Sequence, residues 1–126
     1  MGKIIVYNTS LEDHTSSENN FYIGRPSPLS NPFTHDGKRS SLAKKSFKTR
    51  EEAIAAFELY FKEMYGKDKE LTRMFDEIYE KYKNGEDVYL QCFCKPEPCH
   101  GDIIAKYIQK KLIREKREEY LKSKQK

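Results

Sequence analysis

The sequence predicts a small α/β protein whose sheet is at least partly parallel, with Rossmann-like helical crossovers between strands. Short β-branched or aromatic runs open the chain, two amphipathic helical patterns follow, and a later apolar run leads directly into a third helix. Strands separated by helices need crossover connections, which join parallel strands. The 126 residues suit one domain, and the 13% aromatic content supplies bulky side chains for its core.

Two strands are expected near the N-terminus. Lys3–Tyr7 is mainly β-branched and apolar, and Phe21-Tyr22-Ile23 forms a second short run that ends at Gly24. The polar residues 9–20 between them predict a loop, in which His14 is expected to be solvated.

A long segment without helical or strand periodicity spans residues 24–48. Arg25-Pro26-Ser27-Pro28 and Asn31-Pro32-Phe33 give it stiff turns, which favour an ordered loop after the second strand. Part of it can add another short strand. Loops of this length in small domains are typically functional or disordered.

Two helices are predicted next. Thr49 followed three residues later by Glu52 is a capping box, and the helix that it opens ends at Gly66. A second helix is expected from about Asp68 to Lys83.

A buried strand and a third helix complete the predicted fold. Val88 to Cys94 alternates, so that Val88, Leu90, Cys92 and Cys94 share one face. The third helix begins near Cys99 and can continue into the C-terminal segment.

The basic charge of the chain is concentrated at its C-terminal end. The net charge is +4, and residues 114–126 hold six Lys or Arg and three Glu, a net of +3 that leaves +1 for residues 1–113. We therefore expect a single α/β domain, 1–113, and a basic helical extension or tail, 114–126. The tail from Arg114 to Lys126 suits nucleic acid or an acidic partner, and the alternative is a solvated helix end.

The composition indicates a cytoplasmic protein without membrane contact. No run approaches the roughly 20 apolar residues of a membrane span, and Ile4–Val6 is too short for a secretion signal. The three cysteines are odd in number and too close in sequence for a disulfide framework. The oligomeric state is not indicated.

A turn that carries several reactive side chains follows the last predicted strand. Its residues are Cys92, Cys94, Cys99, His100, Gly101 and Asp102. Ligands of open α/β sheets bind beyond the carboxyl ends of strands. The start of a helix offers unpaired N–H groups and a positive dipole end that favours a thiolate.

Three interpretations of this turn stay open. In the first it binds a polar or anionic ligand, and Cys99, His100 and Asp102 are its catalytic residues, although neighbours such as Cys99 and His100 usually point apart. In the second the three cysteines and His100 hold zinc, which the C-x-C spacing disfavours because structural sites use C-x2–4-C knuckles. In the third Cys92 and Cys94 are small core residues.

The loop after the second strand is the other candidate segment. Gly24 permits a sharp turn, and Arg25, held extended by Pro26, projects a guanidinium that suits phosphate or carboxylate. Ser27 and Asn31 can add hydrogen bonds. The alternative is an ordered surface loop in which Arg25 pairs with a nearby carboxylate.

The motifs Gly24-Arg25-Pro26-Ser27-Pro28, Asn31-Pro32-Phe33 and Cys92-x-Cys94-x-Pro96-x-x-Cys99-His100-Gly101-Asp102 resemble the small bacterial and phage family catalogued as domain of unknown function 4326. The resemblance runs from about Val6 to Tyr107. It implies a single intracellular α/β domain, in the host cytoplasm if the gene is of phage origin. It implies no activity, because none is established for the family.

Two departures from the family pattern are visible. Ser30 stands where the family often has Gly, and Phe93 stands where it often has Trp. Neither removes a polar group from the proposed site.

We therefore expect a binding site for a nucleotide or another anionic small molecule. Its ligand-binding residues are Gly24, Arg25, Ser27, Asn31, Cys94 and Gly101. Any reaction on a nucleotide or nucleic-acid base would use Cys99, His100 and Asp102, and the sequence does not decide whether one occurs. The alternatives are a non-enzymatic protein that modulates a host protein or binds nucleic acid through Arg114–Lys126, and a zinc-binding module.

Overall fold

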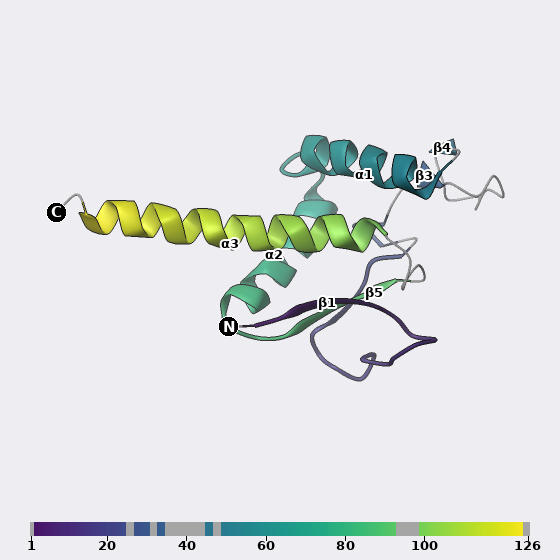
Figure 1. Cartoon of the computed structure of the whole chain (residues 1–126), viewed down its shortest axis with the longest axis horizontal. Helices are drawn as coiled ribbons and strands as arrows, with labels where there is room; N and C mark the ends of the chain where they lie inside the picture. The colour runs from purple at the N-terminus through teal and green to yellow at the C-terminus, as the bar shows by residue number, and fades with distance from the viewer. Residues whose placement is uncertain are drawn as a thin grey trace.

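A computed structural model of the chain describes residues 2–24, 27–30, 33–34, 45–46, 49–92 and 99–124. Its elements follow in the order β1 (Ile4–Asn8), β2 (Asn20–Tyr22), β3 (Phe33–Thr34), β4 (Lys45–Ser46), α1 (Arg50–Met64), α2 (Lys69–Lys83), β5 (Val88–Cys92) and α3 (His100–Lys124) (Figure 1).

The main sheet is parallel, and its central strand is the last one in the sequence. The strand order is β1-β5-β2, and β5 pairs in parallel with both neighbours, with Leu90 opposite Val6 on one side and Phe21 on the other. This confirms the predicted α/β class with a small parallel sheet. A separate pair, β3 and β4, is also parallel, so the long segment contributes two very short strands.

The strand boundaries differ from the predicted ones by one or two residues. β1 begins and ends one residue later than expected, and β2 ends at Tyr22. The amide of Ile23 still donates to the carbonyl of Gln91 at 3.0 Å, so the pairing with β5 continues one residue past β2. β5 ends at Cys92, and Cys94 lies outside the described residues.

One face of the sheet carries the core. Val88, Leu90 and Cys92 are buried on β5, as their alternation predicts, and they belong to one cluster with buried side chains of all three helices. The helices lie on this one face in Figure 1. Two helical layers around a sheet, as in a full Rossmann-like fold, are not found among the described residues.

The other face of the sheet is covered by the loop between β1 and β2. The ring of His14 stacks on Tyr89, with centroids 4.1 Å apart, and meets the buried ring of Tyr7 edge-on at 4.9 Å. His14, expected to be solvated, is thus only partly so, with 29% of its side chain exposed, because Tyr89 of the outer sheet face offers it a flat aromatic surface.

The predicted caps explain where α1 and α2 begin. Thr49 Oγ1 accepts a hydrogen bond from the amide of Glu52 at 3.1 Å, and Asp68 accepts from the amides of Glu70 and Leu71. Gly66 follows α1 with a φ of 91°, a conformation that favours glycine.

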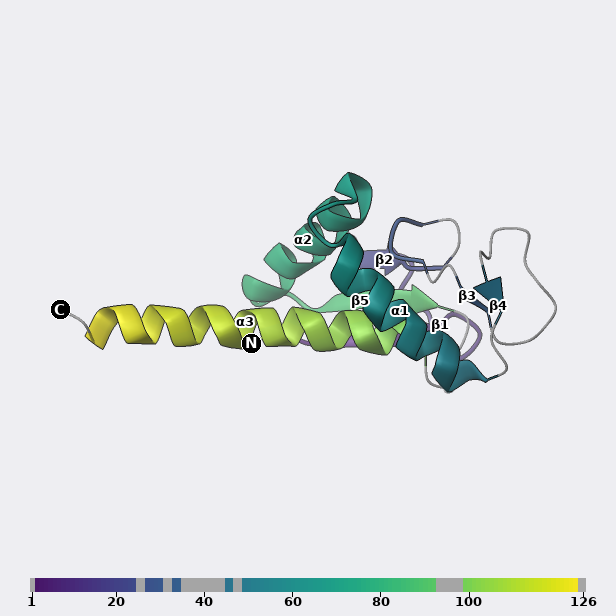
Figure 2. The same cartoon turned by 90° about the horizontal axis from the view of Figure 1, so that it is seen from above.

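The last helix is continuous and extends beyond the rest of the molecule. α3 reaches Lys124 without interruption, and its C-terminal half projects past every other element in both Figure 1 and Figure 2. Glu115 forms the last anchor to α2, since it accepts a hydrogen bond from the Tyr79 hydroxyl at 2.7 Å and pairs with Lys83 at 3.2 Å. No helix in the described part of the chain is long and apolar enough to cross a membrane.

We predict that Glu115 makes the fold acid-sensitive. The Tyr79 hydrogen bond and the nearby Lys83 ammonium lower the pKa of Glu115 below its usual value. A carboxyl whose pKa is lower in the folded chain stabilises it above the unfolded pKa, and this contribution disappears as pH falls through the folded value. Urea unfolding between about pH 7 and pH 3 should therefore show a smaller loss of stability for Glu115→Gln than for the wild type.

The matched control is Glu119→Gln, which removes an exposed carboxylate from the same helix. Its stability should fall with pH as steeply as that of the wild type. Parallel curves for wild type and Glu115→Gln would show that the anchor carries no acid dependence.

Candidate functional site

The carboxyl ends of the three main strands lie at one edge of the sheet. Because β1, β5 and β2 are parallel, Asn8, Cys92 and Tyr22 end their strands on the same side. The chain enters the Gly24 turn from β2 at this edge, and α3 starts there (Figure 2). Both predicted segments therefore reach the edge where α/β proteins bind ligands.

The start of α3 is capped by its own side chains. The Cys99 thiol sulfur accepts from the amide of Gly101 at 3.3 Å, and Asp102 Oδ2 accepts from the amide of Cys99 at 3.1 Å. The arrangement is similar to a capping box, except that the Cys99 thiol bonds the amide of the second helical residue, Gly101, and the amide of Asp102 donates to the Cys99 carbonyl. Two of the first-turn N–H groups are thus already bonded within the chain.

His100 joins α3 to the end of β2. Its Nε2 lies 2.7 Å from the carbonyl oxygen of Ile23, and since a carbonyl only accepts, Nε2 carries the proton. The ring is 8% exposed and meets the Phe57 ring of α1 edge-on at 5.1 Å. The imidazole therefore binds together three parts of the chain that are distant in sequence.

Gly101 permits close packing at the same place. A Cβ on Gly101 would lie 2.7 Å from Val6 Cγ1 and 2.8 Å from Ile23 Cδ1, both too close for an ordinary contact. The glycine is buried, so its observed role is to let α3 approach the sheet. Its predicted contact with a ligand stays a prediction.

The Gly24 turn leads into a short ordered segment. The amide of Ser27 donates to the Gly24 carbonyl at 2.8 Å, and Leu29 is fully buried in the core cluster. Ser27 Oγ is shielded from solvent and has no hydrogen-bond partner among the described residues. We call the region where Ile23, the residue before Gly24, meets His100 and Gly101 the junction.

Three of the predicted ligand-binding residues cannot be placed at the junction. Arg25, Asn31 and Cys94 lie outside the described residues. The roles assigned to them stay predictions, as do the catalytic roles of Cys99, His100 and Asp102. In the structure, Cys99, His100 and Asp102 make hydrogen bonds that hold the fold together.

The two described cysteines are buried side by side. Cys92 and Cys99 are 1% and 2% exposed, and their sulfur atoms lie 3.6 Å apart. Burial of Cys92 agrees with the core interpretation. For Cys99, access of a substrate to the sulfur would need the surrounding side chains to move.

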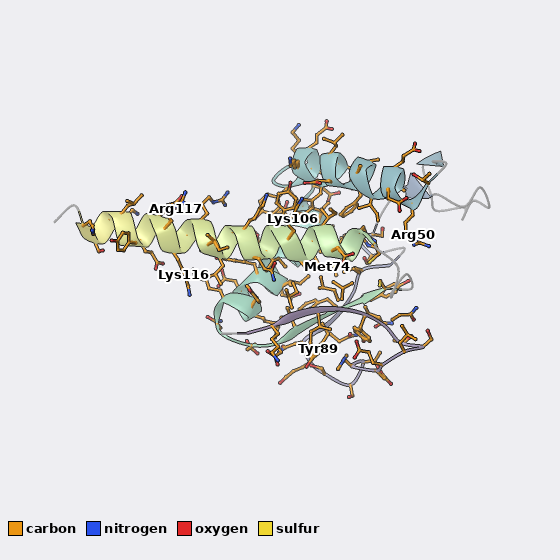
Figure 3. All side chains as sticks on the ribbon, viewed as in Figure 1. Arg50, Met74, Tyr89, Lys106, Lys116 and Arg117 are labelled. Carbon is orange, nitrogen blue, oxygen red and sulfur yellow. The ribbon has the colours of Figure 1, made fainter. Side chains whose placement is uncertain are left out.

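Arg50 lies near this region, although the sequence predicted it only as part of the first turn of a helix. It is the first residue of α1, and Figure 3 shows it at the end of the molecule where α3 begins. Phe57 of α1 contacts His100. Arg50 lies two turns, or about 10 Å, from Phe57 towards the N-terminal end of α1. Its proximity depends on the packing of α1 against α3, which no local motif encodes.

The family model for Domain of unknown function (DUF4326) matches residues 8–110. The chain belongs to this family. The match contains both the Gly24 turn and the Cys-His turn, and it ends before the projecting half of α3. No curated protein and no solved structure matches the chain significantly.

We predict that His100→Phe keeps the ring packing against Phe57 but leaves the Ile23 carbonyl buried without its donor. The loss should be about 1–3 kcal/mol in the free energy of unfolding, measured by urea titration. His14→Phe, which keeps an aromatic ring on Tyr89, is the matched control and should cost less than about 0.5 kcal/mol. Equal effects of the two substitutions would contradict the assigned role of His100.

The zinc interpretation has its own measurement. Among the described residues, no group of three or more His, Cys, Asp or Glu is arranged to hold a metal ion, but Cys94 lies outside this set. We expect elemental analysis of protein purified without chelator to give less than about 0.2 zinc per chain, since structural zinc sites bind tightly enough to be retained. A content near one zinc per chain would establish the zinc alternative instead.

Proposed function

We propose that the junction binds a nucleotide or another small anionic molecule. The observation that supports this proposal is the hydrogen bond from His100 to the Ile23 carbonyl, which holds the first turn of α3 beside the residue preceding Gly24. Two segments with polar side chains are thereby fixed to each other at the carboxyl edge of a parallel sheet, where ligands of such folds bind.

The Ser27 hydroxyl, in the turn that Gly24 opens, is a second observation that favours a ligand. A shielded hydroxyl without a partner costs free energy, about 1–3 kcal/mol by comparison with similar groups. Ser27 Oγ is in this situation among the described residues. A ligand oxygen that accepts or donates a hydrogen bond there would remove the cost.

Arg25 is the residue that we assign to the charge of the ligand. The amides of Cys99 and Gly101 already have partners, so the start of α3 contributes mainly its dipole. A guanidinium binds phosphate through two parallel hydrogen bonds. Asn31 and Cys94 are assigned to the lining of the same site.

A reaction on the bound molecule is the second part of the proposal. His100 uses Nε2 to bond Ile23, so a general base on this ring would be Nδ1. Asp102 would have to release the Cys99 amide before it could accept a proton from a ligand. Binding therefore needs no change in the observed contacts, whereas catalysis by Asp102 does.

We predict that at least one nucleotide or sugar phosphate stabilises the protein in a thermal-shift measurement. At a ligand concentration of about ten times Kd the gain is about 1.4 kcal/mol, or several degrees in Tm for a domain of this size. Arg25→Gln should abolish the shift, because the site then lacks its anion-binding group.

Arg73→Gln is the matched control, since Arg73 is an exposed arginine on α2 that pairs with Glu70. It should keep the full shift. The proposal fails if no nucleotide or sugar phosphate at millimolar concentration changes Tm, or if Arg25→Gln binds like the wild type.

A further inference from the structure

The exposed side of α3 carries cations and no acidic residue of its own. At about 100° per residue, the segment from Lys106 to Lys124 has a strip roughly 120° wide along one side. We call this the basic strip. Its members are Lys106, Lys110, Ile113, Arg114, Arg117, Tyr120, Leu121 and Lys124. Figure 3 shows Lys106 and Arg117 projecting from the same side of the helix.

The acidic residues of this part of α3 lie elsewhere on its circumference. Glu115, Glu118 and Glu119 fall outside the basic strip, and Glu115 is bound to α2 through Tyr79 and Lys83. The basic strip itself therefore contains no acidic side chain, whereas Lys111 and Lys122 lie among the glutamates on the other side of the helix.

Most cations of the basic strip have no acidic partner in the described part of the chain. Lys106 is the exception, because it pairs with Glu58 of α1 at 2.8 Å. Lys110 lies over the Tyr107 ring at 5.5 Å and, like Arg114, has no ion pair there. Like charges spaced four residues apart destabilise a helix by about 0.2–0.5 kcal/mol per pair. A polyanion bound along the strip would attract these cations and offset the repulsion between them.

The strip also carries apolar side chains that are more than half exposed, with the Lys124 ammonium over the Tyr120 ring at 5.2 Å. Ile113, Tyr120 and Leu121 are 65%, 57% and 52% exposed. Ile113 and Tyr120 are two turns apart and form a line along the helix. Lys116 borders this line on one side and Arg117 on the other, at about 60° and 40° from Ile113.

We propose that the basic strip of α3 binds the major groove of double-stranded DNA. Beyond Glu115, whose side chain is bound to α2, the segment from Lys116 to Lys124 is about 14 Å long, and no other element lies beside it in Figure 1 or Figure 2. An α-helix fits the major groove, whose width is about 12 Å. Ile113 and Tyr120 then face the bases, the cations on either side face the phosphates, and Glu118 and Glu119 point away from the groove.

An anionic membrane surface is the less suitable partner. A helix that lies on a membrane separates a continuous apolar face from its cations. On α3, Leu121 lies between Lys110 and Arg114 around the circumference, so burying it in lipid would also bury cationic side chains. The DNA proposal involves neither the junction nor its ligand, and the two can be tested separately.

The test is fluorescence anisotropy with a labelled duplex of about 20 base pairs, recorded over a range of salt concentrations. With four or five cations at phosphates, the slope of log K against log salt should be about −4. The triple variant Arg114→Gln, Arg117→Gln, Lys124→Gln should bind at least about tenfold more weakly, with a slope smaller in magnitude by about 2 to 3.

The matched control removes the same charge away from the strip. It is the triple variant Lys67→Gln, Lys69→Gln, Lys122→Gln, which should bind within about twofold of the wild type. All six substituted side chains are exposed, so neither variant removes a core contact, and circular dichroism verifies equal helix content.

Three results would overturn the proposal. They are no binding of the duplex at low salt, equal weakening by the two triple variants, and binding to phosphatidylserine vesicles with no binding to the duplex. Tighter binding of a single strand than of the duplex would also exclude the major groove as the target.

Discussion

The first turn of α3 is buried, and a buried helix end must find partners for its free N–H groups within the chain. This constraint accounts for most of what surrounds it. Cys99 and Asp102 bond to the amides of that turn, and the imidazole of His100 is directed at the Ile23 carbonyl. A larger residue at Gly101 would force the side chains of Val6 and Ile23 to shift. The Cys-His-Gly-Asp sequence is thus first of all a way to bury a helix start.

The same constraint limits the chemistry that these residues can perform. A group that satisfies a buried polar atom cannot take part in a reaction without leaving that atom unpaired, at a cost of about 1–3 kcal/mol. Cys99 and Asp102 are in this position. Ligand binding, as proposed for the junction, would leave these two hydrogen bonds in place, whereas catalysis by Cys99 or Asp102 would break them.

The elements that could be predicted are those encoded by neighbouring residues. The alternation in Val88–Cys92 gave the buried face of β5, and Thr49 with Glu52 gave the start of α1. The contact between His100 and Ile23 joins residues far apart in sequence and has no local signal. His14 shows the same limit, since its polar neighbours predicted solvent, whereas Tyr89, distant in sequence, provides the ring on which it stacks.

The central place of β5 in the sheet has a consequence for the order of folding. Among the main strands, β1 and β2 pair only with β5, which is the last of them to be synthesised. The helices α1 and α2 form from local contacts and can collapse first, while the sheet waits for long-range pairing. During translation the two early strands therefore remain without partners until β5 is made. We expect the partly synthesised chain at this stage to be the form most prone to aggregation.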